Sequence, residues 1–258
     1  MKKTKLSVEK LISLGTVAVI LFLWYLATQN GWVNKKLIPT PIEVIEAFFE
    51  VWKDYKNYSL LKHLGTSMKR LLMAFGWALV IGIPLGLLSG FSKYVRAAIE
   101  PIIGFYRPLP PLAYYTLLTL ALGIGDESKI ALLFLACFAP IYVSCVSAVT
   151  RIKGDYINSA YTVGASKMQV FTSVIFPSCL PDMFVGVRTA IGVAYTTLVA
   201  AEMVAATSGI GWMVLDAGNW FRNDIIFVGI IIMGITGLAI DWVLKYMERK
   251  LVPWSGKE

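Results

Sequence analysis

The chain has 258 residues, of which 57% are hydrophobic and 16% are charged, and its formal net charge is +8. A soluble domain usually carries about 25% charged residues, so this composition excludes an ordinary water-soluble protein. The basic residues stand mostly at the ends of long apolar runs, which is typical of membrane topology rather than of nucleic-acid binding. The three cysteines form no Cys-x-x-Cys pair and there is one histidine, so the sequence predicts neither a disulfide framework nor a metal centre.

Six apolar regions follow one another along the chain, and each is close to the roughly 20 residues that a helix needs to cross a bilayer. They cover residues 11–27, 71–88, 99–122, 130–150, 183–206 and 225–240, and the third is broken by the sequence YRPLPPLAYY. Backbone polar groups in lipid must be satisfied within each segment, which favours helices. The sequence therefore predicts an all-α polytopic membrane protein with six transmembrane helices. The basic N-terminus lacks a small-residue cleavage site, so we interpret the first region as a retained span.

The distribution of Lys and Arg predicts the orientation of these spans. If the N-terminus is in the cytoplasm, the inner connections contain more basic residues than the outer ones, which favours cytoplasmic N- and C-termini. Residues 1–60 then form a first span and an external segment. Residues 61–250 form a membrane core with a cytoplasmic loop at 151–181, and residues 251–258 form a cytoplasmic tail.

The external segment contains a predicted helix over Pro39–Asp54. Thr40 is placed to cap it, with Pro41 in the first helical position and Glu43 in the third. Its larger apolar residues recur at helical spacing. They are Ile42, Ile45, Phe48, Phe49 and Trp52. We expect this helix to lie on the membrane surface or on the helix bundle, and a simple packing element is the plainer interpretation.

The longest inner connection contains a polar stretch, Ser159–Pro181, between two apolar runs. Its first half reads as a helix interrupted at Gly164, where the chain can bend or a partner can approach closely. We expect Pro177 and Pro181 to stop the helix before the next span. The residues alone leave two alternatives open, a docking element with small side chains or an amphipathic connector.

The sequence NSAYTVGASKMQVFTSVIFPSCLP, which contains this stretch, resembles the EAA loop of ABC-importer permeases. Six residues fall in register with that motif: Ala160, Gly164, Ala165, Ser166, Phe171 and Pro177. Asn158 and Ser159 depart from it, because the family usually has Glu and Ala there. The segments FYRPLPPLA, AEMVAATSGIGWMV and LVPWSGK resemble the branch that imports taurine, sulfonates, nitrate and bicarbonate, and within it the taurine permeases most.

This resemblance implies a type I ABC-importer permease in a bacterial cytoplasmic membrane. Its implied partners are a second permease copy, a pair of cytoplasmic ATPase subunits that bind ATP and Mg, and an external substrate-binding protein. The residues implied to couple the permease to the ATPase are Asn158, Ser159, Ala160, Gly164, Ala165, Ser166 and Pro177. The sequence contains no G-x-x-x-x-G-K-[ST] motif, so we expect no nucleotide cofactor and no ATP hydrolysis in this chain.

Three charged residues near the spans are candidates for the translocation pathway, since intramembrane charges usually face water or the bundle interior. Arg107 precedes three prolines and could meet an anion, or its side chain could extend to the headgroups. Arg188 occupies a similar position in the fifth region. Glu202 could line the pathway, pair with a basic residue or order the following TSGIGW loop. That loop, which includes Ser208, Gly209, Gly211 and Trp212, could meet the binding protein, gate the pathway or be a tight turn.

The expected solute is small and anionic or zwitterionic, with taurine or another alkanesulfonate favoured. Nitrate, bicarbonate or a pyrimidine precursor are alternatives with the same architecture. A membrane-embedded enzyme is disfavoured because the spans lack paired carboxylates and nucleophile–base arrangements. A self-sufficient secondary transporter is disfavoured because no paired intramembrane acid is present to couple an ion.

Overall fold

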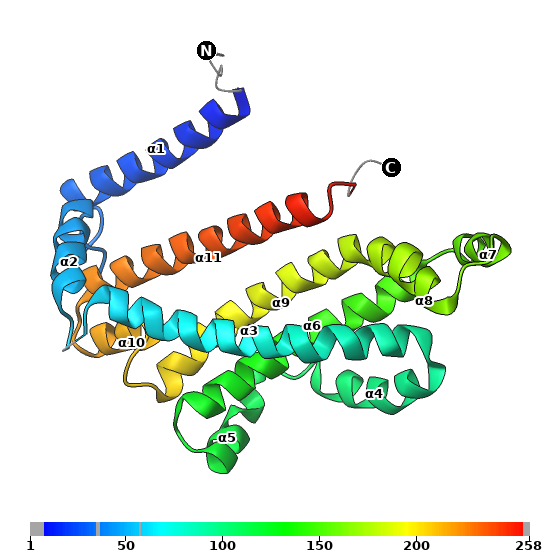
Figure 1. Cartoon of the computed structure of the whole chain (residues 1–258). Helices are drawn as coiled ribbons and strands as arrows, with labels where there is room; N and C mark the ends of the chain where they lie inside the picture. The colour runs from blue at the N-terminus through cyan, green and yellow to red at the C-terminus, as the bar shows by residue number, and fades with distance from the viewer. Residues whose placement is uncertain (1–7, 35–36, 57, 255–258) are drawn as a thin grey trace. The chain divides into compact units, whose positions relative to one another are not determined.

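The computed structural model describes residues 8–34, 37–56 and 58–254, and all regular elements in these ranges are helices apart from one bridge between Tyr55 and Tyr58. The chain divides into two compact units. One comprises the N-terminal segment to Leu61 together with Met213–Ile232, and the other comprises Lys62–Trp212 together with the segment from Met233 onward. The all-α prediction is confirmed (Figure 1).

Five helical segments are long and apolar enough to cross a membrane. They are α1 (Val8–Gln29), α3 (Leu60–Phe91), α6 (Asp126–Arg151), the run from α8 to the end of α9 (Lys167–Ala205) and α11 (Asn223–Leu251). The predicted third region is divided between α4 (Lys93–Tyr106) and the shorter α5 (Pro111–Leu122). The break falls at the predicted prolines, which cannot continue regular helical hydrogen bonding. The arrangement agrees with six membrane regions.

The first unit contains the helix α2 (Pro41–Lys53), which is capped as predicted. The Thr40 hydroxyl accepts from the Glu43 backbone N–H, and the Glu43 carboxylate accepts from the Thr40 N–H at 2.7 Å. Together these bonds satisfy two backbone donors at the helix start. The residues that α2 buries are Val44, Ala47 and Val51, whereas four of the five large apolar residues of the predicted stripe are exposed.

The core of the second unit is built from α3, α6 and α9 (Figure 1). Gly82, Gly86 and Gly90 recur at intervals of four on α3 and meet Ile141, Cys145 and Val149 of α6. A Cβ at Gly86 or Gly90 would come within 2.6 Å of the α6 side chains, so these positions bring the two helix backbones together. Small residues commonly allow such close helix packing in membranes.

The expected helix stop at Pro177 and Pro181 is wrong. Both prolines lie inside α9 (Phe176–Ala205), which follows α8 (Lys167–Val170) and a π-turn, Phe171–Ile175, without a break. The Phe176 N–H bonds to the Phe171 carbonyl five residues earlier, which is π-helical spacing. Pro177 then falls in the first turn of α9, where its missing N–H costs little.

Candidate functional site

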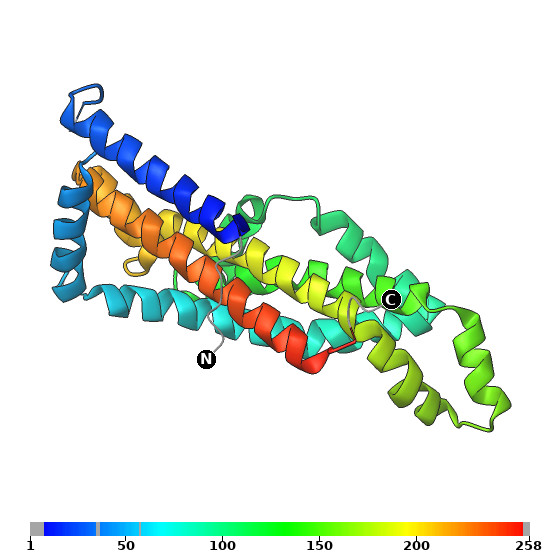
Figure 2. The same ribbon diagram turned by 90° about the horizontal axis from the view of Figure 1, so that it is seen from above.

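The connection between α6 and α9 forms two short helices, α7 (Gly154–Thr162) and α8, at the far end of both long helices (Figures 1 and 2). Gly164 terminates α7 in the left-handed region, with φ +85°. The Ala165 N–H bonds to the Ala160 carbonyl at 3.1 Å and the Gly164 N–H bonds to the Tyr161 carbonyl at 2.9 Å. This pair of bonds is a Schellman motif, which satisfies the last carbonyls of a helix and favours glycine at this position.

The following helix begins at once with a second capping arrangement. The Ser166 hydroxyl accepts from the Gln169 N–H, and the Gln169 side chain accepts from the Ser166 N–H at 2.8 Å. Gly164, Ala165 and Ser166 therefore have local structural roles: they end one helix, turn the chain and start the next. The Gly-Ala-Ser sequence fixes the angle at which α7 leaves α8.

The surface of this loop is exposed and partly apolar. The helix α7 has no buried residue, and the side chains of Val163 and Met168 are 84% and 69% exposed. Ala160 and Ala165 pack partly against the core of the unit, while Asn158, Ser159 and Ser166 are exposed. Pro177 is half-buried at the start of α9, where it lines a depression together with Tyr156 of α7. A shallow depression of about 340 Å³ includes Ala160, Val163, Gly164, Ala165, Gln169, Val170, Ser173 and Val174.

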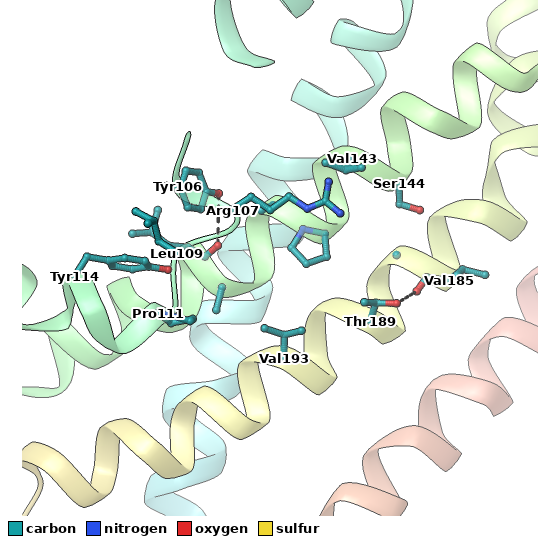
Figure 3. A pocket seen from close by; sticks show the side chains of 15 residues that line it. Tyr106, Arg107, Leu109, Pro111, Tyr114, Val143, Ser144, Val185, Thr189 and Val193 are labelled. Carbon is teal, nitrogen blue, oxygen red and sulfur yellow. Dashed lines mark hydrogen bonds between the residues drawn. The ribbon is translucent and has the colours of Figure 1, made fainter. Parts of the chain in front are cut away.

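A larger cavity, of about 400 Å³, lies between the α4–α5 connection, α6 and α9. Arg107 lines it together with Tyr106 and Tyr114, and hydroxyls of Ser144 and Thr189 add polar atoms to a mostly aliphatic wall. In Figure 3 the Arg107 guanidinium points toward Val143 and Ser144. Among the residues that the structure describes, Arg107 makes no ion pair with a carboxylate. The cavity therefore presents one uncompensated positive charge beside apolar surface.

Arg188 does not line this cavity. Its guanidinium lies beside α11, 3.1 Å from the Asp241 carboxylate and 3.3 Å from the Glu248 carboxylate. The two carboxylates compensate its charge, so Arg188 attracts an anion less strongly than Arg107 does. The structure separates these two arginines, although the sequence suggested the same role for both.

Glu202 lies in a third place, buried in a polar cluster near the end of α9. Its carboxylate accepts from Arg70 Nη1 at 2.7 Å, from the Ser67 hydroxyl at 2.8 Å and from the Gly211 N–H at 3.0 Å. Glu202 and Arg70 are 1% and 4% exposed. The carboxylate thus both pairs with a basic residue and holds the loop that follows α9.

Further contacts of the same cluster hold the loop that follows α9. Arg70 also binds the Asp126 carboxylate at 2.6 Å and the Ser208 carbonyl at 2.8 Å. The Gly209 N–H donates to His63 Nδ1, whose ring stacks on Trp212 with centroids 5.5 Å apart. Three residues of α3 that the sequence interpretation missed take part: His63, Ser67 and Arg70. Their spacing of four and three, which places them on one face of α3, is the signal that could have revealed them.

The helix architecture and the exposed α6–α9 loop define a membrane transport subunit, and the comparisons with known proteins identify its family. Residues 82–253 match the binding-protein-dependent transport system inner membrane component, and the chain belongs to this family. It is 37% identical to the taurine transport system permease protein TauC of Escherichia coli over 98% of this chain and 92% of that protein.

Two further relatives come from the same branch. The putative aliphatic sulfonates transport permease protein SsuC of Bacillus subtilis is 31% identical, over 92% of this chain and 85% of that protein. The nitrate import permease protein NrtB of Synechocystis is 32% identical, over 93% and 89%. The fold is also that of a chain in the MetNI methionine ABC transporter, with a TM-score of 0.63 and 17% identity over 74% of this chain and 95% of that chain. The chain is therefore an ABC-importer permease of the taurine, sulfonate and nitrate branch.

Proposed function

We propose that this permease imports a small anionic or zwitterionic solute, most favourably taurine or another alkanesulfonate. The observation that carries the proposal is the uncompensated Arg107 in a cavity of about 400 Å³ whose wall is otherwise mostly aliphatic. A guanidinium donates hydrogen bonds in a planar fork that suits sulfonate or carboxylate oxygens. The aliphatic wall suits the short carbon chain of an alkanesulfonate better than nitrate or bicarbonate, which have no carbon chain to place against it.

We further propose that the exposed α7 and the Gly-Ala-Ser turn dock on a cytoplasmic ATPase subunit. The Schellman turn fixes the end of α7, whose Ala160 rests partly on the core, and the apolar side chains of Val163 and Met168 are exposed. A rigid projecting helix can transmit a movement of its partner to α6 and α9, which continue from its two ends. ATP and Mg would be bound by that partner, a second permease copy would complete the pathway, and an external binding protein would deliver the solute.

The proposal also includes the orientation of the chain in the membrane. With α7 in the cytoplasm, the Glu202 cluster at the opposite end of α9 faces outside, and both termini are cytoplasmic. This agrees with the excess of Lys and Arg in the inner connections.

The first experiment measures ATP hydrolysis by the complex reconstituted in vesicles with its ATPase and binding protein, with taurine, nitrate and bicarbonate titrated separately. We expect stimulation by taurine and not by the two inorganic anions. Stimulation by nitrate or bicarbonate alone would retain the transport class and overturn the choice of substrate.

Variants at Gly164 test the docking part. Gly164→Leu is expected to reach the membrane and to lose solute-stimulated ATP hydrolysis, because Leu adds bulk to the turn and disfavours its left-handed backbone. Gly164→Asn is the matched control, because Asn tolerates this backbone region and can end a helix. Unchanged transport by the Leu variant would exclude a coupling role for this turn.

A further inference from the structure

The external helix α2 has three distinct faces. At 3.6 residues per turn, its side chains separate into three lengthwise stripes. One stripe, Val44, Ala47 and Val51, is buried. A second stripe is acidic and consists of Glu43, Glu46 and Glu50, and the third consists of the apolar residues Ile42, Ile45, Phe49 and Trp52. The third stripe is open, with Phe49 60% exposed and Ile45 57% exposed.

Contacts with α1 and α11 hold the start of α2, and these contacts lie a few residues inside the ends of both helices. The indole N–H of Trp24 in α1 donates to the Pro39 carbonyl at 3.0 Å, and the Trp24 ring stacks on Phe227 of α11 with centroids 5.5 Å apart. Trp24 precedes the end of α1 at Gln29, and Phe227 follows the start of α11 at Asn223. At 1.5 Å per helical residue, both contacts lie about 6–8 Å inside the ends of the spans. If these spans end at the membrane surface, that depth matches the roughly 5–10 Å to which an interfacial helix buries its apolar face.

Polar contacts hold the remainder of α2 at the same membrane boundary. Glu50, on the acidic stripe, binds Arg222 at 2.6 Å, and Arg222 immediately precedes α11. Beyond the helix, the Tyr55 hydroxyl donates to the Asp216 carboxylate at 2.9 Å. Burial raises the pKa of Tyr55 well above its usual value, and the bond to Asp216 acts in the same direction, so the phenol remains a donor. The acidic stripe therefore lies at the level where α11 begins.

The direction of α2 agrees with a position in the plane of the membrane. In both views it runs crosswise to α1 and to the first turns of α11 (Figures 1 and 2). Two more exposed aromatic side chains, Trp220 and Phe221, precede Arg222 and are 64% and 88% exposed. Amphipathic aromatic side chains are enriched where a protein crosses the membrane–water interface.

We propose that α2 is an in-plane membrane helix whose stripe of Ile42, Ile45, Phe49 and Trp52 enters the acyl-chain region of the leaflet in which α1 ends. Its occupant is lipid, because the contacts of Trp24 and of Glu50 with Arg222 hold α2 at the ends of two helices that are apolar enough to cross a membrane. The acidic stripe faces water, and the third face packs on the protein. In this position α2 anchors the outer ends of α1 and α11 at a fixed depth, independently of which solute is carried.

The test places a nitroxide spin label on the full chain in lipid vesicles. Cys137, Cys145 and Cys179, which are 0–1% exposed, are first replaced by Ala. The label is then attached at Phe49→Cys on the apolar stripe or at Glu46→Cys, its matched control on the acidic stripe. Collisions of the label with oxygen, which partitions into lipid, are compared with collisions with a water-soluble nickel chelate.

We expect the ratio of oxygen to nickel collisions to exceed one at position 49 and to fall below one at position 46. A label at Leu21→Cys, on the exposed surface of α1, gives the reference ratio for acyl chains. Greater access to nickel at position 49 would mean that the stripe faces water. Exclusion of both probes there would mean that a second copy or another protein covers it. Either result would overturn the proposal.

A second measurement needs no cysteine replacement. Bromine on the lipid acyl chains quenches nearby tryptophan fluorescence, so the wild-type chain is compared with Trp52→Phe in brominated and ordinary vesicles. We expect the quenched fraction to fall when Trp52 is replaced, because the variant lacks a lipid-contacting fluorophore. An equal or larger quenched fraction in the variant would contradict contact between Trp52 and the acyl chains.

Discussion

The two loops at opposite ends of α9 are alike in backbone and different in surroundings. Each contains a glycine with positive φ, +85° at Gly164 and +120° at Gly209, and each is followed by the start of a helix. A Cβ at Gly164 would meet nothing within 4 Å, whereas a Cβ at Gly209 would overlap the Glu202 carboxylate. The chain therefore fixes one loop with its own buried charges and leaves the other exposed. This difference in surroundings is the reason for proposing that the exposed loop, and not the buried one, docks on a partner.

The largest expected effect is that of Glu202→Ala. It leaves the Arg70 guanidinium with Asp126 as its remaining carboxylate partner and removes the acceptor of the Gly211 N–H. Removing one partner of a buried ion pair typically costs about 3–5 kcal/mol. We expect a matching loss of unfolding free energy, measured in detergent by denaturant titration with fluorescence detection.

The control for this variant is Glu127→Ala, which removes an exposed carboxylate from the first turn of α6. Its expected cost is within about 0.5 kcal/mol, as for most surface substitutions. Equal stability of the Glu202 and Glu127 variants would show that the buried cluster does not hold the loop that contains Gly209.

A direct comparison of the two turns comes from Gly209→Ala and Gly164→Ala. Both variants force a side chain into the positive-φ region of backbone space, which costs about 1–2 kcal/mol for a left-handed residue. Gly209→Ala must also displace the Glu202 carboxylate, so we expect the larger fall in thermal unfolding temperature there. A larger fall for Gly164→Ala would mean that the exposed turn has contacts within the subunit that its surroundings do not indicate.

The sequence predicted those features of the fold that depend on residues close together in the chain. The cap at Thr40 and the break before Pro111 follow from side chains within four residues, and both are confirmed. The Arg70–Glu202 pair joins residues 132 positions apart, so no local pattern indicates it. The predicted helix stop at Pro177 is wrong because the π-helical turn before it lets the helix continue past the proline. This change in hydrogen-bond spacing depends on how the whole loop joins α9.

A smaller effect is expected from Ser166→Ala in the exposed loop. The variant removes the side chain that accepts from the Gln169 N–H, and loss of a helix N-cap typically costs about 1 kcal/mol. Because α8 is exposed at this point, we expect a local loss, seen as faster amide exchange at residues 167–170 with little change in global unfolding. Ser166→Asp, which restores an acceptor, should return the exchange rates toward those of the wild-type chain. Failure of Asp to do so would argue against the cap as the cause.

The smallest effect on stability is expected from Val163→Asp, and it separates the two loops most sharply. Val163 is 84% exposed and lies beside Gly164, so replacing it should change the unfolding free energy by no more than about 0.5 kcal/mol. If α7 docks on an ATPase subunit, a carboxylate at this position would be desolvated in the interface, and copurification with that subunit should fall. Tyr94→Asp adds the same charge at an exposed position of α4, outside the proposed docking loop, and is the matched control. A loop fixed within its own subunit, like that of Gly209, would show the reverse: loss of stability without a specific loss of partner.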